Sequence, residues 1–174
     1  MRYRSLLLAI FLVFISLTMS SYTDVNGDFQ RRGIEKLEFG DYNGAIVDFS
    51  KAIEIDPNDA VAYDYRGVAK AKRGDFSGSL LDYNKSIELD PNRVDTYGNR
   101  GIAKARSGNL NEAIIDFDLA ISIDPNNGNA FFNHGMSMDM TGNLVTACLD
   151  WKKAVELGDD KGIKFIAKNC FQSE

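Results

Sequence analysis

Histidine and cysteine are scarce in this chain of 174 residues, and each scarcity excludes a kind of site. The lone histidine, His134, leaves no Ser-His-Asp or Cys-His set to assemble. The two cysteines, Cys148 and Cys170, form no Cys-x-x-Cys redox motif, and with one histidine they are too few for a structural zinc site. A glycine-rich phosphate loop is also missing. The sequence therefore predicts no catalytic residue, no metal and no cofactor.

The three prolines that are present carry the most information. Pro57, Pro91 and Pro125 each lie in an Asp-Pro-Asn tripeptide, and the spacing between them is 34 residues both times. A period of this length indicates a repeated helix–turn–helix unit that stacks into a solenoid. Alignment on the prolines gives four frames, residues 26–59, 60–93, 94–127 and 128–161, the last with Asp159 in place of proline.

Other positions of the 34-residue frame repeat as well. Positions eight and fifteen are glycine: Gly33, Gly67, Gly101, Gly135 and Gly40, Gly74, Gly108, Gly142. Positions four and twenty-four are aromatic: Phe29, Tyr63, Tyr97, Phe131 and Phe49, Tyr83, Phe117, Trp151. Positions twenty and twenty-seven are small: Ala45, Ser79, Ala113, Ala147 and Ala52, Ser86, Ala120, Ala154. Large residues that alternate with small ones predict close packing of two antiparallel helices.

The turns between helices can also be predicted. A glycine at position fifteen can adopt a left-handed conformation and end the first helix of each frame. The next residue, Asp41, Asp75, Asn109 or Asn143, can cap the second helix. We expect the Asp-Pro-Asn tripeptide to stop the second helix and its asparagine to cap the helix that follows.

This pattern resembles the tetratricopeptide repeat, with an aromatic, Gly, Ala, Phe and Pro at these offsets over residues 26–161. The departures are regular. Position seven, usually Leu, is Arg32, Arg66, Arg100 and His134, and position eleven, usually Tyr, is Lys36, Lys70, Lys104 and Met138. The resemblance implies an all-α right-handed solenoid of four helix pairs plus a C-terminal capping helix. It also implies an open groove lined by the first helix of each pair.

Position twenty-three is aspartate in every frame: Asp48, Asp82, Asp116 and Asp150. Since position seven should be partly enclosed between helices, an arginine there needs a carboxylate partner. We therefore predict Asp–Arg pairs along the stack; the alternative is that both series are solvated. Either interpretation is structural, because a feature repeated in every frame does not single out one reaction centre.

The first 21 residues differ from the rest. Arg2 and Arg4 precede an apolar run from Leu6 to Leu17, and small polar residues follow. This layout predicts a secretory signal peptide over residues 1–21, removed on export to a periplasm or to the outside of the cell. The alternative is an uncleaved anchor that tethers residues 22–174, the repeat domain, to a membrane.

The C-terminal tail reads as a short capping helix over residues 162–171. The chain reverses near Asp159, and Cys148 and Cys170 are equally far from it, so an antiparallel hairpin would place them side by side. In an oxidising compartment we expect a disulfide that fixes the capping helix. The alternative is a pair of buried thiols.

The resemblance places positions two, five, six, nine, twelve and thirteen near the groove. On that basis the predicted contact residues are Asp64, Lys72, Asn99, Arg106, Phe132, Met136 and Met140. The alternative for those in the last frame is packing against the tail or the preceding helix. Family members that bind acidic chaperone tails use a clamp of Lys, Asn and Arg; Gln30 and Ile34 occupy its first two places here, so that ligand is not expected.

The predicted function is a non-catalytic scaffold or assembly adaptor that holds a protein or peptide partner. The net charge of −5 argues against nucleic acid as the partner, because phosphate backbones require a basic surface. No small-molecule substrate is expected. The alternatives are a structural subunit of an oligomer and a membrane-tethered scaffold.

Overall fold

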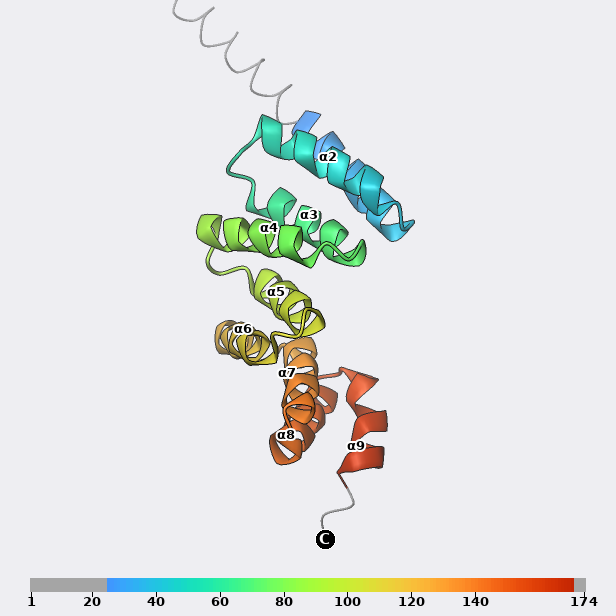
Figure 1. The fold of residues 1–174 in the computed structure, drawn as a ribbon, viewed down its shortest axis with the longest axis vertical. Coiled ribbons are helices and arrows are strands. Elements are labelled where there is room, and N and C mark those ends of the chain that lie inside the picture. The colour runs from blue at the N-terminus through green and yellow to red at the C-terminus, as the bar shows by residue number, and fades with distance from the viewer. Residues whose placement is uncertain (1–24, 171–174) are drawn as a thin grey trace, which may run out of the picture.

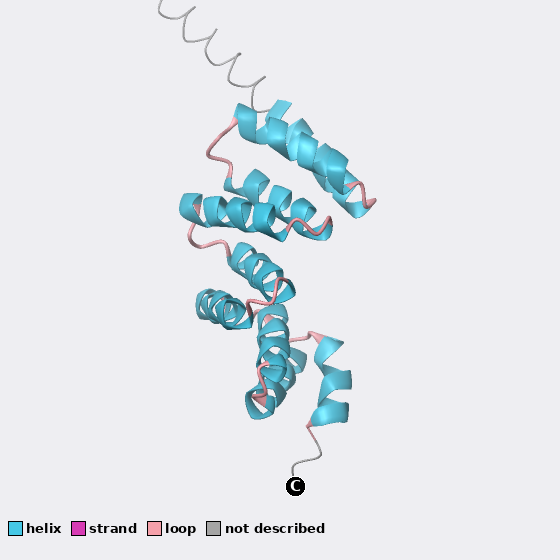
Figure 2. Cartoon of the chain, viewed as in Figure 1, coloured by secondary structure: helices cyan, strands magenta, loops and turns pink. Residues whose placement is uncertain are grey.

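The structure is a computed structural model that describes residues 25–170, and the predicted signal peptide lies outside the described residues. Within residues 25–170 every regular element is helical (Figure 2). The first helix of this part covers residues 25–38. The helices that follow are α2 (Tyr42–Ile55), α3 (Ala60–Lys72), α4 (Phe76–Leu89), α5 (Val94–Arg106), α6 (Leu110–Ile123), α7 (Gly128–Met140), α8 (Leu144–Glu156), the 3₁₀ turn η1 (Asp160–Gly162) and α9 (Ile163–Asn169).

The helices form four consecutive pairs that follow one another down the long axis of the molecule (Figure 1). Residues 25–38 pair with α2, α3 with α4, α5 with α6, and α7 with α8. The short helix α9 lies beside the last pair at the C-terminal end. The predicted fold, an all-α right-handed solenoid of four helix pairs with a C-terminal capping helix, is confirmed.

The turn inside each repeat follows the sequence prediction closely. The glycine at position fifteen has a positive φ in all four repeats, from 78° at Gly40 to 91° at Gly108. Asp41, Asp75 and Asn143 then accept a hydrogen bond from the backbone N–H three residues on. Asn109 stands at the equivalent place but accepts no such bond from the described residues, so its predicted capping role is wrong.

The turn between repeats corrects a second prediction. Asn58 does not cap the next helix; Asp59 does, accepting a hydrogen bond from the N–H of Ala62 at 3.0 Å. The reason is that Asp56 accepts a bond from the N–H of Asn58, which closes the Asp-Pro-Asn turn on itself and delays the helix by one residue. The other two tripeptides do the same, and the caps there are Arg93 and Asn127.

Each pair of helices packs a glycine against an aromatic ring. A Cβ on Gly67 would lie 2.6 Å from Cε1 of Tyr83, which leaves no room for a side chain. The glycines at position eight of the other repeats face Phe49, Phe117 and Trp151 in the same way. The small residues at positions twenty and twenty-seven are fully buried in all four repeats. The predicted alternation of large and small residues therefore forms the core between the helices.

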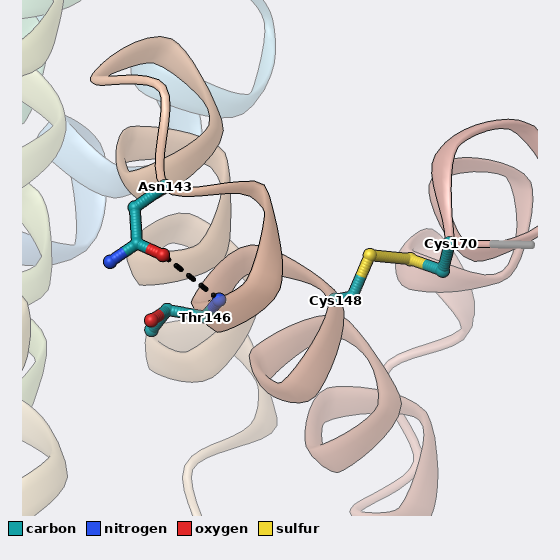
Figure 3. Close-up of a disulfide and its surroundings, with 4 residues drawn as sticks. All are labelled: Asn143, Thr146, Cys148 and Cys170. Atoms are coloured by element: carbon teal, nitrogen blue, oxygen red, sulfur yellow. Dashed lines mark hydrogen bonds between the residues drawn. A yellow bond between two sulfur atoms is a disulfide. The ribbon is translucent and has the colours of Figure 1, made fainter. Parts of the chain in front are cut away.

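The last repeat is covered by the tail. The ring of Phe165, on α9, lies 5.1 Å from that of Trp151 and 5.6 Å from that of Phe132. In the structure Cys148, on α8, and Cys170, which follows α9, form a disulfide with an S–S distance of 2.05 Å (Figure 3). The α9 helix is therefore held to the end of the stack by both aromatic contacts and a covalent link.

Candidate binding groove

A ladder of ion pairs runs through the stack and uses the basic residues at positions seven and eleven of the first three repeats. In the second repeat Asp82 is buried, and Arg66 donates to both its oxygens at 2.7 and 2.9 Å. Nζ of Lys70 also lies 2.7 Å from Oδ2 of Asp82. The first and third repeats have the same arrangement, with Arg32, Lys36 and Asp48, and with Arg100, Lys104 and Asp116. The predicted pairing of aspartate with arginine is confirmed, and the lysine at position eleven is an additional partner that we had not predicted.

The position-seven residue also reaches back to the preceding repeat. Nη1 of Arg66 donates to Oγ of Ser50 at 3.2 Å. Nη1 of Arg100 donates to Oδ1 of Asn84 at 2.7 Å. Since the acceptors occupy one position of the frame, the ladder links neighbouring repeats in the same way each time.

His134 takes the arginine's place in the fourth repeat. Its Nδ1 lies 2.7 Å from Oδ2 of Asp150, in its own repeat, and Nε2 lies 3.3 Å from Oδ1 of Asp118, in the preceding one. Burial of the ring lowers the pKa of His134, but the hydrogen bond to Asp150 and the charges of Asp150 and Asp118 outweigh it, and the pKa is raised overall. The fourth rung of the ladder thus has a histidine in the place that arginine occupies in the other three repeats.

Two basic residues on the first helices take part in no ion pair with another described residue. Within the described residues, Lys72 and Arg106 are the cations of the first helices that pair with no carboxylate. Both are exposed and occupy position thirteen of consecutive repeats. Their side chains, with Asn99, line one pocket between α3 and α5 whose apolar walls include Val68 and Ile102. The structure therefore brings three of the predicted contact residues together.

Asp64 has a different role from the one predicted. Its side chain is 4% exposed, and its Oδ1 accepts a hydrogen bond from Nδ2 of Asn99 at 3.2 Å. Arg93 lies 3.6 Å from its other oxygen. Burial raises the pKa of Asp64, although the hydrogen bond from Asn99 and the charge of Arg93 act in the opposite direction. Asp64 therefore positions Asn99 and is not free to contact a partner directly.

The predicted contact residues of the fourth repeat lie elsewhere. Phe132 contacts the ring of Phe165, and the ammonium group of Lys161 lies 5.4 Å from its centroid. For Phe132 the structure thus favours the alternative of packing against the tail. Met136 is half-buried, whereas Met140 is 62% exposed at the end of α7. The three residues do not line the pocket that holds Lys72 and Arg106.

Sequence reasoning missed a regular surface on the second helices. Position twenty-two is apolar and exposed in every repeat, with exposed fractions between 52% and 71%: Val47, Leu81, Ile115 and Leu149. We call these four residues the outer stripe. The repetition at position twenty-two was a signal available in the sequence. Apolar side chains exposed at one place in four repeats are a candidate contact surface.

In the described part of the chain no helix is long and apolar enough to cross a membrane.

Paired helices, glycine–aromatic contacts and an open face together define a helical-repeat scaffold of the kind that binds other proteins. Residues 36–74 match a family described as "TPR repeat", and residues 82–115 match "Tetratricopeptide repeat". The chain belongs to the tetratricopeptide-repeat family.

Solved structures agree with this assignment. A crystal structure of MamA superposes with a TM-score of 0.71 at 22% identity, over 85% of this chain and 86% of that one. PilF of Pseudomonas aeruginosa gives a TM-score of 0.75 at 20% identity, over 81% and 64% of the two chains. The first repeat domain of Spaghetti (RPAP3), bound to the HSP90 peptide SRMEEVD, superposes with a TM-score of 0.66 at 23% identity, over 68% of this chain and 94% of that one. These likenesses establish the fold, and no curated protein matches the chain.

Proposed function

We propose that this protein binds a protein or peptide partner in the groove formed by residues 25–38, α3, α5 and α7. Its fold is that of a protein–protein interaction scaffold. The observation that carries the proposal is the pocket between α3 and α5. It combines apolar walls with two cations, Lys72 and Arg106, that pair with no carboxylate of the described residues. RPAP3, a protein of the same fold, holds a peptide in its solved structure.

We also propose that the protein performs no chemistry of its own. The buried aspartates Asp48, Asp82 and Asp116 occupy the same position of their repeats and are paired with arginines, as expected of groups that hold the stack together. Burial lowers the pKa of His134, but the carboxylates of Asp150 and Asp118 raise it overall. His134 therefore interacts with the ladder that holds the repeats together. The protein would therefore act by holding its partner.

A photo-crosslinking side chain tests where the partner binds. Gly98 faces the groove, and apart from the adjoining backbone of its own helix no described atom lies within 4 Å of the place where its Cβ would be. Leu81, 71% exposed in the outer stripe, provides the matched control position. We expect irradiation of native cells to give an adduct of defined mass from position 98 and none from position 81. Adducts from position 81 alone would contradict binding in the groove.

The outer stripe favours a second candidate function, that of a structural subunit. Four exposed apolar side chains at equal spacing would suit association of copies through the second helices. Light scattering distinguishes the two functions. A molecular mass that increases with protein concentration would favour the structural subunit, provided that the Leu81→Asp variant has the mass of a monomer. A monomeric mass at all concentrations would favour the adaptor.

We further propose that the protein is exported, that residues 1–21 are removed, and that Cys148 and Cys170 are oxidised in the native protein. The basic and apolar N-terminal segment supports export. The bonded sulfur atoms in the structure support the oxidised state, since such bonds persist in oxidising compartments. A membrane-tethered scaffold with the N-terminal segment retained is the alternative.

A further inference from the structure

We infer that the exposed face of α9, together with the shallow pocket beside it, docks on a membrane surface that carries anionic phospholipid. The pocket lies between α7, η1 and α9, and its lining includes Phe132, Lys161, Ile163, Lys164, Phe165 and Ala167. We call the exposed face of α9 and this pocket the basic patch. The inference goes beyond the proposed binding of a partner, because the patch does not include the pocket between α3 and α5.

The charge of α9 is opposite in sign to that of the whole chain. The net charge of the chain is −5, whereas residues 161–170 contain three lysines and no carboxylate. Lys161 is paired with Asp159 at 2.9 Å, but Lys164 and Lys168 are exposed and form no ion pair with the described residues. Since these two lysines are four residues apart, they lie on one face of α9. An anionic surface would supply the opposite charge that they lack.

Apolar side chains lie beside these lysines. Ile163 is 52% exposed, and Ala167, one turn further along α9, is exposed as well. The rings of Phe132 and Phe165 also line the pocket. Nζ of Lys164 lies 5.0 Å from the centroid of the Phe165 ring, so the stem of this lysine can cover apolar surface while its charge stays outside. Apolar side chains bordered by lysines are typical of helices that lie in a membrane interface.

The composition of the pocket favours lipid over an acidic protein. Its cations are lysines, which attract phosphate as point charges and impose no fixed hydrogen-bond geometry. Its lining includes no amide or hydroxyl side chain that could recognise the backbone of a peptide. Asp160 is the one carboxylate of the lining and is outnumbered by Lys161 and Lys164. The few lysines of the patch do not suit a nucleic acid, whose binding depends on many phosphate contacts.

The position of α9 sets how the protein would meet a membrane. This helix lies at the end of the stack opposite residues 25–38 (Figure 1). The bond from Cys170 to Cys148 of α8 holds it in place. Because the rest of the chain is acidic, an anionic surface would repel it and attract only this end. The molecule would therefore dock end-on and keep the groove free for a partner.

Sedimentation with lipid vesicles tests the inference on the protein purified from its native cells. One set of vesicles consists of phosphatidylcholine alone, and the other of equal parts of phosphatidylcholine and phosphatidylglycerol. We expect the protein to bind the second set at least about tenfold more tightly than the first. Added salt should weaken this binding, since it screens the charge of the vesicle surface.

Matched variants test the residues. Lys164→Glu/Lys168→Glu should weaken binding to the anionic vesicles by at least about tenfold, and Lys164→Gln/Lys168→Gln should weaken it less. Ile163→Ser should also weaken it, because less apolar surface enters the interface. Lys51→Glu/Lys72→Glu changes the net charge equally at exposed sites on α2 and α3, and it should leave binding unchanged. All variants share one N-terminal segment, so its own affinity for lipid cancels, and circular dichroism shows whether they remain folded.

Three outcomes would overturn the inference. The first is equal binding to the two sets of vesicles. The second is an equal loss of binding in the two glutamate variants, which would show that only the net charge matters. The third is binding to soluble polyglutamate but to neither set of vesicles, which would assign the basic patch to an acidic protein.

Discussion

Gly67 and Gly98 both lie on first helices, yet a methyl group would have opposite effects at the two. At Gly67 it would lie 2.6 Å from the buried ring of Tyr83, whereas at Gly98 it would meet no described atom within 4 Å beyond the adjoining backbone of its own helix. We expect Gly67→Ala to lower the free energy of unfolding by about 1–3 kcal/mol through overpacking. Gly98→Ala should raise it by about 0.5–1 kcal/mol, because alanine is the better helix former. Urea denaturation measures both, and similar values for the two variants would contradict the packing argument.

His134 should make the stability of the protein depend on pH. Its pKa in the folded chain is raised above the ordinary value of 6.5, so folding favours the protonated ring. The resulting stabilisation is complete below about pH 6.5 and is lost as pH rises through the folded pKa. The stability advantage of the wild-type protein over His134→Gln should therefore be larger at pH 6 than at pH 8.

Thermal melts at a series of pH values compare the two proteins. Parallel curves would show that the histidine contributes no charge to the ladder. His134→Arg is a second check, because it restores the residue type of the other three repeats. Its stability relative to His134→Gln should stay constant over the same pH range.

At the scale of single elements, α9 depends on its attachments. It spans Ile163–Asn169, and none of its residues is fully buried. We expect Cys148→Ser/Cys170→Ser to lower the stability of the oxidised protein by up to about 3 kcal/mol in the chain-entropy view of a disulfide. Hydrogen exchange should become faster in α9 and stay unchanged in α3 to α6. Unchanged protection of α9 would mean that Phe165 and its ring contacts suffice to hold it.

The elements also show how far local sequence signals extend. The glycine at position fifteen and the caps Asp41, Asp75 and Asn143 could be predicted, because each acts within one turn of chain. The cap between repeats was predicted one residue too early: Asn58 donates its own N–H to Asp56 within the turn, and Asp59 caps the next helix by accepting from the N–H of Ala62. Lys70 was not predicted as a second partner of Asp82, because the family pattern led us to expect only position seven to be enclosed between helices.

For the molecule as a whole, the period of 34 residues was sufficient to predict the fold. The period was not sufficient to predict which residues line the groove. Lys72, Asn99 and Arg106 were predicted and do line one pocket, but Asp64 proved to be buried and Phe132 to contact the tail. The difference is physical: stacking depends on features that every repeat shares, whereas a binding surface depends on contacts that occur once.

Export can be tested on the intact protein from its native cells. We expect the measured mass to lack about 20 N-terminal residues, the usual length of a signal peptide. The same species should gain two hydrogens on reduction, as the Cys148–Cys170 bond opens. A full-length mass that reduction does not change would contradict both export with cleavage and the oxidised state.

The ladder of ion pairs has a consequence for the number of repeats. From the second repeat on, each rung joins a residue at position seven to its own repeat and to position twenty-five of the repeat before it. A tandem duplication of residues 94–127 would therefore insert a unit that already fits both neighbours. The duplicated Arg100 would face Asp118 of the original copy, and His134 would face Asp118 of the new one. The gene could lengthen this array one unit at a time without compensating mutations, and the groove would grow with it.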